Sequence, residues 1–173
     1  FNGNKIITTG GGGALITDDA ALAKRAKHLT TTAKRPHPWL FQHDEVGFNY
    51  RLPNLNAALG LAQMAQLDNF VAKKRSLAKY YAEWLGKWPQ ATFFTEPAGT
   101  RSNYWLNAIL LRDRATRDEF LGRTNERGIM TRPMWTPMYT LPMYQNCQRF
   151  SLDNADLIES RLVNIPSSAV TLP

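Results

Sequence analysis

The first thirteen residues combine one basic side chain with a run of glycines. Lys5 is followed by Thr8 and Thr9, and then by the four glycines Gly10–Gly13. Glycine tolerates positive φ and tight turns, so backbone N–H groups here could lie against a phosphate or a ring. The residue order excludes a Walker A loop and the GxGxxG fingerprint. By spacing alone, the stretch indicates either a cofactor site or a flexible linker beside a solvated lysine.

A second candidate segment, residues 43–63, reads HDEVGFNYRLPNLNAALGLAQ. Gly47 and Asn49 are typical of a turn, and Arg51 is a candidate anion-binding side chain. The alternative is a loop that leads into a core helix and has no part in binding. Spacing alone leaves these two interpretations equally open.

The elements that must position these residues follow from patterning. The apolar run 14–17 (ALIT) predicts a buried strand, and a helix capped by Thr17–Asp18 follows it. Residues 30–45 are polar and contain prolines, which predicts a long loop, and such loops in compact domains are usually functional.

The helix that begins at Pro53 or Asn54 is almost wholly apolar, because its polar side chains fall on one stripe formed by Asn56, Gln63 and Gln66. A helix of this kind is buried, either in a core or in a subunit interface.

The remainder of the chain alternates between helices and strands, which predicts an α/β architecture with a break near Leu52. The expected elements are a helix over 70–88, a strand within 103–111, a helix from a Thr116–Glu119 capping box to Gly128, a strand over 129–133, a Pro-punctuated loop over 136–144, a last helix over 153–163 and an extended tail over 164–168.

Composition bounds the class of protein. Apolar residues make up 43% of the chain, which argues against disorder. The single cysteine, Cys147, excludes an intramolecular disulfide and a Cys-based zinc site, and a cytoplasmic protein without a membrane span fits these features. The net charge of +7 suits a polyanion-binding module, but no block of five basic residues occurs, and the densest basic runs lie in predicted helices, where a solvated face is the simpler interpretation.

Taken together, the Lys5–glycine stretch and the segment GFNYRLPNLNAALG resemble the DegT/DnrJ/EryC1/StrS family. These are pyridoxal-phosphate-dependent nucleotide-sugar aminotransferases of fold type I. The resemblance continues through SNYWLNAILL and TRPMWTPMYTLPMY to RLVNIPSS and so covers essentially all 173 residues. The segment AKRPHPWLFQHDEVGFNYRLPN is most similar to the branch that makes 4-amino sugars for bacillosamine- and legionaminic-type glycans.

On this resemblance, the chain is the C-terminal part of a fold type I aminotransferase about twice as long. Residues 1–52 would end the large domain that binds pyridoxal 5'-phosphate, and residues 53–173 would form linking helices and a small α+β domain. A serine before Phe1 and the aspartate that holds the pyridine nitrogen would lie in the N-terminal half. The chain alone is therefore expected not to transaminate.

The resemblance also implies roles for individual residues. Lys5 would be the Schiff-base lysine, which binds the cofactor aldehyde and then shuttles a proton. Asn49 would reach the cofactor phosphate of a neighbouring subunit, which implies a homodimer with composite sites. His43, Arg51 and Tyr139 are candidate substrate-binding residues, although His43 could be an exposed loop imidazole and Arg51 could brace the loop. Many relatives have His where this chain has Tyr139.

The function expected from these residues is transfer of an amino group, with glutamate as donor, to a 4-keto nucleotide-linked sugar in surface-polysaccharide biosynthesis. No metal, nucleic acid or membrane is expected to take part. Two alternatives remain at this point, namely a basic polyanion-binding module and a non-catalytic dimerisation domain.

Overall fold

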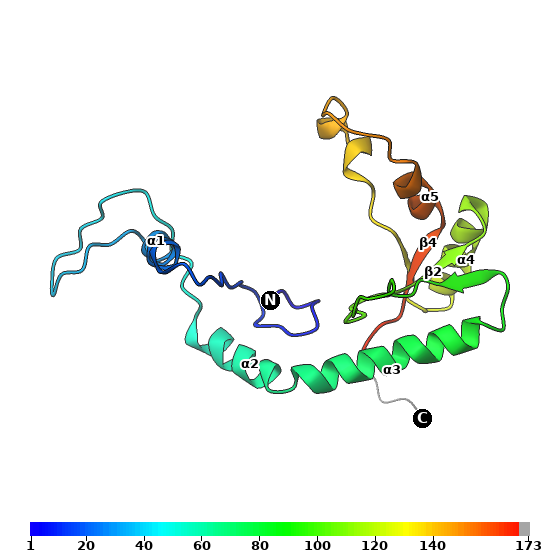
Figure 1. Ribbon diagram of the computed structural model, residues 1–173, viewed down its shortest axis with the longest axis horizontal. Coiled ribbons are helices and arrows are strands. Elements are labelled where there is room, and N and C mark those ends of the chain that lie inside the picture. Colours follow the sequence, from blue (N-terminus) through cyan, green and yellow to red (C-terminus); the bar gives the residue numbers. More distant parts are fainter. Residues whose placement is uncertain (170–173) are drawn as a thin grey trace. The chain divides into compact units, whose positions relative to one another are not determined.

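The computed structural model describes residues 1–169, which divide into two compact units (Figure 1). The first unit is Phe1–Leu67 and contains α1 (Ala20–Thr30) and α2 (Asn54–Met64), which long irregular segments connect. The second unit begins at Asp68 and contains the sheet. Within residues 1–169, no helix is both long enough and apolar enough to span a bilayer.

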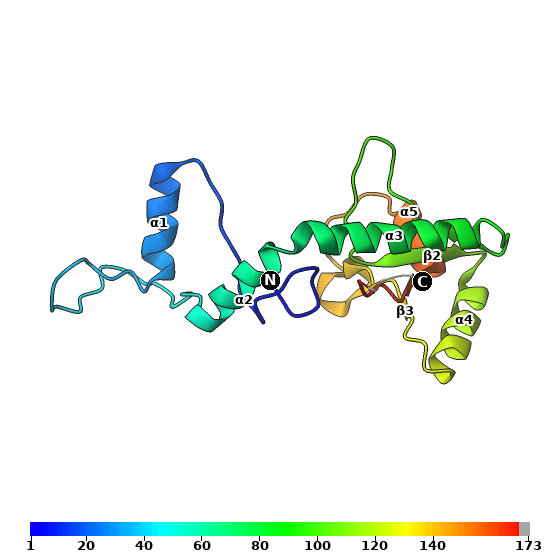
Figure 2. The same cartoon turned by 90° about the horizontal axis from the view of Figure 1, so that it is seen from below.

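The second unit is a four-stranded antiparallel sheet with helices packed around it. The strands are β1 (Ala91–Phe93), β2 (Asn107–Leu111), β3 (Arg132–Pro133) and β4 (Leu162–Ile165), in the spatial order β1-β2-β4-β3. The last strand in sequence therefore lies in the interior of the sheet. The long helix α3 (Leu67–Leu85) runs along the sheet, as Figure 2 shows, and α4 (Arg114–Glu126) and α5 (Asp153–Arg161) complete the unit.

The core of this unit lies between α3 and the sheet. Strand β2 alternates, with Asn107, Ile109 and Leu111 buried and the residues between them half-buried, as the period of two in a strand requires. The apolar side chains of this cluster come from α3, β1, β2 and β4: Ala78, Leu85, Phe93, Ile109, Leu111, Val163 and Ile165.

Polar side chains of α3 hold the segments that flank the sheet. The buried Lys74 donates from Nζ to the carbonyl oxygens of Trp105 (3.1 Å) and Ser167 (2.6 Å), and burial lowers the pKa of this amine. Arg75 donates to both carboxylate oxygens of Glu96, at 3.0 and 2.7 Å. The helix is therefore tied to the sheet by hydrogen bonds as well as by its apolar face.

Two predicted segments differ from the structure, one expected as a strand and one expected as a helix end and tail. Residues 14–17 form no strand within the described chain, because a strand needs a neighbouring strand for its backbone hydrogen bonds and none pairs there. Residues 162–165 form β4, whereas the sequence pattern predicts the end of a helix and an extended tail. Four apolar-rich residues directly after a helix carry no separate signal, and β4 is specified by its pairing with β2 and β3.

The predicted helices form, but the capping residues of two of them were assigned wrongly. The side chain of Asp19, and not that of Asp18, caps α1 by accepting the N–H groups of Ala21 and Leu22. Helix α4 begins after Asp113, whose carboxylate accepts the Thr116 N–H at 2.8 Å, so Thr116 is not the cap. Pro53 occupies the cap position of α2, and Asn54 is its first residue. In α4, the aspartate one turn before the predicted cap is preferred, because a carboxylate is a strong acceptor at a helix N-terminus.

The Arg75–Glu96 pair makes the second unit sensitive to acid. The pKa of Glu96 is lowered from 4.5 to about 2. The hydrogen bonds from Arg75 are the largest cause, and the hydrogen bond from the Ser102 N–H is the next. Because the pKa is lower in the folded protein, the stabilisation is complete above about pH 4.5 and is lost as the pH falls toward 2. We expect Glu96→Gln to lower the free energy of unfolding at pH 7, and the difference from the unmodified protein to shrink below pH 4.5.

Denaturant titrations at several pH values measure this difference. The control is Glu119→Gln, which removes an exposed pair between Glu119 and Arg123 within α4. A difference for Glu96→Gln that stays constant from pH 7 to pH 3 would contradict the assignment.

Candidate functional site

Residues 31–50, which we call the paired loop, fold back on themselves after α1. Isolated antiparallel bridges join Thr31 to Asn49 and Lys34 to His43. The Phe48 N–H donates to the Leu29 carbonyl at 2.7 Å and the Thr32 N–H donates to the Phe48 carbonyl at 3.0 Å. The predicted loop is therefore ordered by backbone pairing, although it forms no regular strand.

A glycine lets the two arms of the paired loop approach closely. A Cβ atom at Gly47 would lie 2.5 Å from the Ala33 nitrogen and 2.6 Å from the Thr32 carbonyl carbon, which are backbone atoms that cannot rotate away. Thr32 and Ala33 themselves have positive φ values of 73° and 49°, which cost free energy for residues with a Cβ. Gly47 is thus required by the contact, and Ala33 beside it is fully buried.

Asn49 and Arg51, two predicted site residues, are joined to each other. Arg51 donates from Nη1 to the Asn49 Oδ1 at 3.3 Å and from Nη2 to the Thr31 carbonyl at 2.9 Å. The guanidinium therefore braces the paired loop, which is one of the two roles that the sequence left open. His43 lies further along the loop, opposite Lys34, and its Nδ1–H donates to the Thr32 carbonyl at 2.6 Å.

The loop that carries Lys5 rests on the polar stripe of α2. The Asn56 side-chain amide donates to the Thr9 carbonyl, and the Gln63 Oε1 accepts the Thr8 N–H at 3.4 Å. A Cβ at Gly60, which lies between them on the same face, would be 2.7 Å from the Thr9 Cγ2. The stripe was visible in the sequence, but its function of holding this backbone was missed.

The glycine run adopts conformations that the sequence predicted. Gly10 and Gly12 have positive φ values of 79° and 109°. Together with Gly13, Arg51 and Lys27 of α1, Gly12 lines an open cavity of about 770 Å³ within the first unit. Lys5 lies in the exposed turn that precedes the run, where its backbone N–H donates to the Asn2 carbonyl at 3.1 Å.

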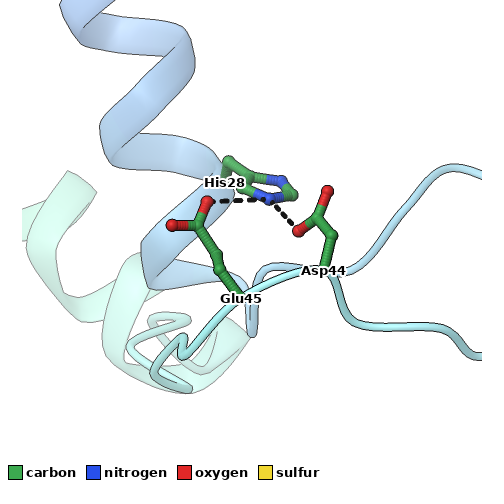
Figure 3. Close-up of side chains that lie close together, drawn as sticks. All are labelled: His28, Asp44 and Glu45. Atoms are coloured by element: carbon green, nitrogen blue, oxygen red, sulfur yellow. Dashed lines mark hydrogen bonds and ion pairs between the residues drawn. The ribbon is translucent and has the colours of Figure 1, made fainter.

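Side chains of α1 meet two acids of the paired loop, and Figure 3 shows one of them, His28, between Asp44 and Glu45. The Nε2 atom of His28 lies 2.7 Å from Oδ1 of Asp44 and 3.4 Å from Oε1 of Glu45. Arg25 donates to both carboxylate oxygens of Glu45. Arg35 lies 3.5 Å from Asp44. The hydrogen bond from His28 is the main cause that lowers the pKa of Asp44, and that from Arg25 is the main cause that lowers the pKa of Glu45.

Tyr139, the remaining predicted site residue, belongs to the second unit. It lies in the short 3₁₀ helix Met138–Thr140, and the Arg149 guanidinium lies 5.5 Å from the centre of its ring. Within residues 1–169 its buried hydroxyl oxygen has no hydrogen-bond partner, although a buried hydroxyl normally has one. The predicted role in substrate binding stays a prediction.

The fold is that of sugar aminotransferases. The chain superposes on PseC of Helicobacter pylori, an aminotransferase involved in the biosynthesis of pseudoaminic acid, with a TM-score of 0.86 and 24% identity over 95% of this chain and 45% of that chain. This confirms the predicted fold class. Residues 1–171 match the DegT/DnrJ/EryC1/StrS aminotransferase family, and the chain belongs to that family.

Curated relatives agree with this assignment. The chain is 40% identical over 144 residues to EpsN of Bacillus subtilis, a putative pyridoxal phosphate-dependent aminotransferase, of which it covers 37%. It is 36% identical over 168 residues to GDP-perosamine synthase of Escherichia coli O157:H7, of which it covers 45%. These matches cover 83% and 96% of this chain. Because they cover only 37% and 45% of the relatives, the chain spans less than half the length of either one.

The contact at Gly47 leads to a prediction about stability. Gly47→Ala introduces a Cβ into backbone atoms, so we expect it to lower the free energy of unfolding by about 1–3 kcal/mol, as overpacking does. Gly122→Ala in α4 is the control, because a Cβ there meets nothing within 4 Å and should stabilise the helix by about 0.5–1 kcal/mol. Denaturant unfolding of the full-length parent protein checks both variants, and a free energy of unfolding that Gly47→Ala leaves unchanged would disprove the close approach.

Proposed function

We propose that this chain is the C-terminal part of a pyridoxal-phosphate-dependent aminotransferase that transfers an amino group from glutamate to a 4-keto nucleotide-linked sugar. The observation that carries this proposal is the family match over residues 1–171, which includes Lys5 and the paired loop. A relative named GDP-perosamine synthase supports a nucleotide-linked sugar as the substrate class. The 4-keto position and membership of the 4-amino-sugar branch rest on the similarity of residues 33–54.

The packing of the first unit supports the proposal that a longer protein surrounds it. Within residues 1–67, all of which the structure describes, only Thr9 and Ala33 are buried. Large apolar side chains are instead exposed, among them Ile16 (94%) and Leu55 (85%). A unit of this size without an apolar core cannot offset its loss of conformational entropy. The helix that the sequence predicts to be buried, α2, is therefore expected to be covered by the remainder of the parent protein or by a second copy.

The residues of the first unit have the chemistry that pyridoxal phosphate requires. Lys5 offers a primary amine for the aldehyde, and the Asn49 amide and the Arg51 guanidinium are donors suited to a phosphate. When bound, this cofactor supplies an electron-withdrawing ring that stabilises negative charge on the reacting carbon. Lys5 then holds and moves the proton at its Nζ, because only an amine can both bind the aldehyde and act as a base.

The paired loop is proposed to act across a homodimer. On the family resemblance, Asn49 binds the cofactor phosphate at the neighbouring subunit, while Lys5 acts in its own. Arg51 is proposed to assist with the phosphate or the substrate. The exposed position of Asn49 on the paired loop is compatible with reaching a second chain. We expect a composite site, a protein that acts in the cytoplasm, and no transamination by the 173-residue chain alone.

Chemical labelling tests the role of Lys5. We expect borohydride reduction of the cofactor-loaded parent protein to leave a pyridoxyl group on Lys5, which peptide mass spectrometry detects. The Lys5→Arg variant keeps the charge but cannot condense with the aldehyde, so its peptide should stay unlabelled. Labelling of a different lysine, with Lys5 unmodified, would refute the assignment.

Subunit mixing tests the composite site. Lys5→Ala and Asn49→Ala parent proteins are each expected to be inactive or weakly active. A mixed dimer would contain one site with both wild-type residues, so an equal mixture should recover activity in about a quarter of all sites. Mixtures that stay as inactive as the separate variants would show that both residues act within one chain.

A further inference from the structure

We propose that Asp44 and Glu45, held by Arg25 and His28 of α1, are positioning residues that keep the paired loop in the conformation in which Asn49 binds a phosphate. We call these four side chains the latch. The proposal rests on the proposed function, because it concerns the loop that would bind the cofactor phosphate. Nothing in the family resemblance assigns a role to the four residues.

The latch adds side-chain contacts between α1 and the returning arm of the loop, which backbone hydrogen bonds such as that from the Phe48 N–H to the Leu29 carbonyl already join. Arg25 and His28 lie one turn apart on α1, so both face the loop. On the loop side, Asp44 and Glu45 are adjacent, and each carboxylate takes a hydrogen bond from a different donor of α1. Two donors of α1 therefore hold the returning arm of the loop, and Figure 3 shows the His28 side of this arrangement.

The position of the latch determines where Asn49 lies. Only Val46, Gly47 and Phe48 separate Glu45 from Asn49, so the position of the acids is passed to Asn49 through a short stretch of backbone. Beyond it, the Tyr50 N–H donates to the Thr30 carbonyl at 2.9 Å, at the end of α1. The latch and the α1 terminus thus bracket Asn49 on both sides, and releasing the acids frees one of the two brackets.

The charges of the cluster favour an ion-pair network over a metal site. The donor atoms of His28, Asp44 and Glu45 lie within 4.8 Å of one another, which is compatible with a cation. However, Arg25 already binds both oxygens of Glu45, and Arg35 lies beside Asp44, so positive charge already balances both carboxylates. A divalent cation would have to displace these guanidinium groups.

The latch side chains are partly exposed, which sets the size of the expected effect. Their exposed fractions are between 25% and 54%, and ion pairs of this kind contribute little to global stability. Ordering one loop involves a smaller free energy than unfolding the whole protein, so a weak ion-pair network is enough to control it. We therefore expect removal of the latch to loosen the loop and weaken cofactor binding while leaving the melting temperature nearly unchanged.

The experiment uses the full-length parent protein with pyridoxal 5'-phosphate as the probe. The variants are Glu45→Gln, the double variant Asp44→Asn/Glu45→Gln, and each of these combined with Asn49→Ala. The control, Glu83→Gln, removes an exposed pair with Lys79 on α3. Amide hydrogen exchange of residues 44–50 is followed without cofactor, and the cofactor Kd is measured by absorbance titration.

The proposal predicts three results. Glu45→Gln should raise the cofactor Kd about threefold and the double variant about tenfold, the scale of one and two such pairs. Exchange of the Phe48 and Tyr50 amides should rise in both variants, and Glu83→Gln should change neither quantity. In the Asn49→Ala background the latch variants should weaken binding no further, because the latch acts through Asn49.

Other outcomes would overturn the latch. Unchanged amide exchange at Phe48 and Tyr50 in the double variant would contradict it. So would effects of the latch variants and of Asn49→Ala on the cofactor Kd that add fully. If Asn49→Ala itself leaves the Kd unchanged, the proposed role of Asn49 fails. Amide exchange then still decides whether the latch orders the loop.

Discussion

The close approach of Gly47 to the backbone of Thr32 and Ala33 is the contact on which the first unit depends. It lets the two arms of the paired loop lie against each other, so that the backbone of Phe48 can exchange hydrogen bonds with the end of α1. The two positive φ angles at Thr32 and Ala33 are the cost of this path. In a unit with almost no buried apolar surface, these backbone contacts order the loop locally.

The second unit is stabilised in a different way. Its seven-residue apolar cluster lies between α3 and three strands of the sheet, and its polar ties are few and specific. Among residues 1–169, no carboxylate pairs with the buried amine of Lys74. Its desolvation lowers its pKa, and two carbonyl acceptors recover part of the cost. The unit therefore folds around its own core, whereas the first unit exposes the surfaces that a larger assembly would cover.

This difference agrees with the cofactor-binding function proposed for the first unit. Lys5 and Asn49, the residues proposed to bind the cofactor, both lie on loops of the first unit and not in the rigid sheet. Their supports are Asn56 and Gln63 of α2 for the Lys5 loop and the latch for the paired loop. Loops that are held by hydrogen bonds and ion pairs can be precise locally even where packing is sparse, provided that each support is present.

The sequence alone determined the helices to within a few residues, the positive φ angles in the glycine run, and the family, because these depend on local pattern and residue type. Only the tertiary structure decided that 162–165 is an interior strand, since its partners in β2 lie more than fifty residues away. The same holds for the latch, in which Arg25 and Glu45 are twenty residues apart and meet only because Gly47 lets the chain return. Strand pairing and ion pairing are properties of distance in space, and no local pattern in a single sequence encodes that distance.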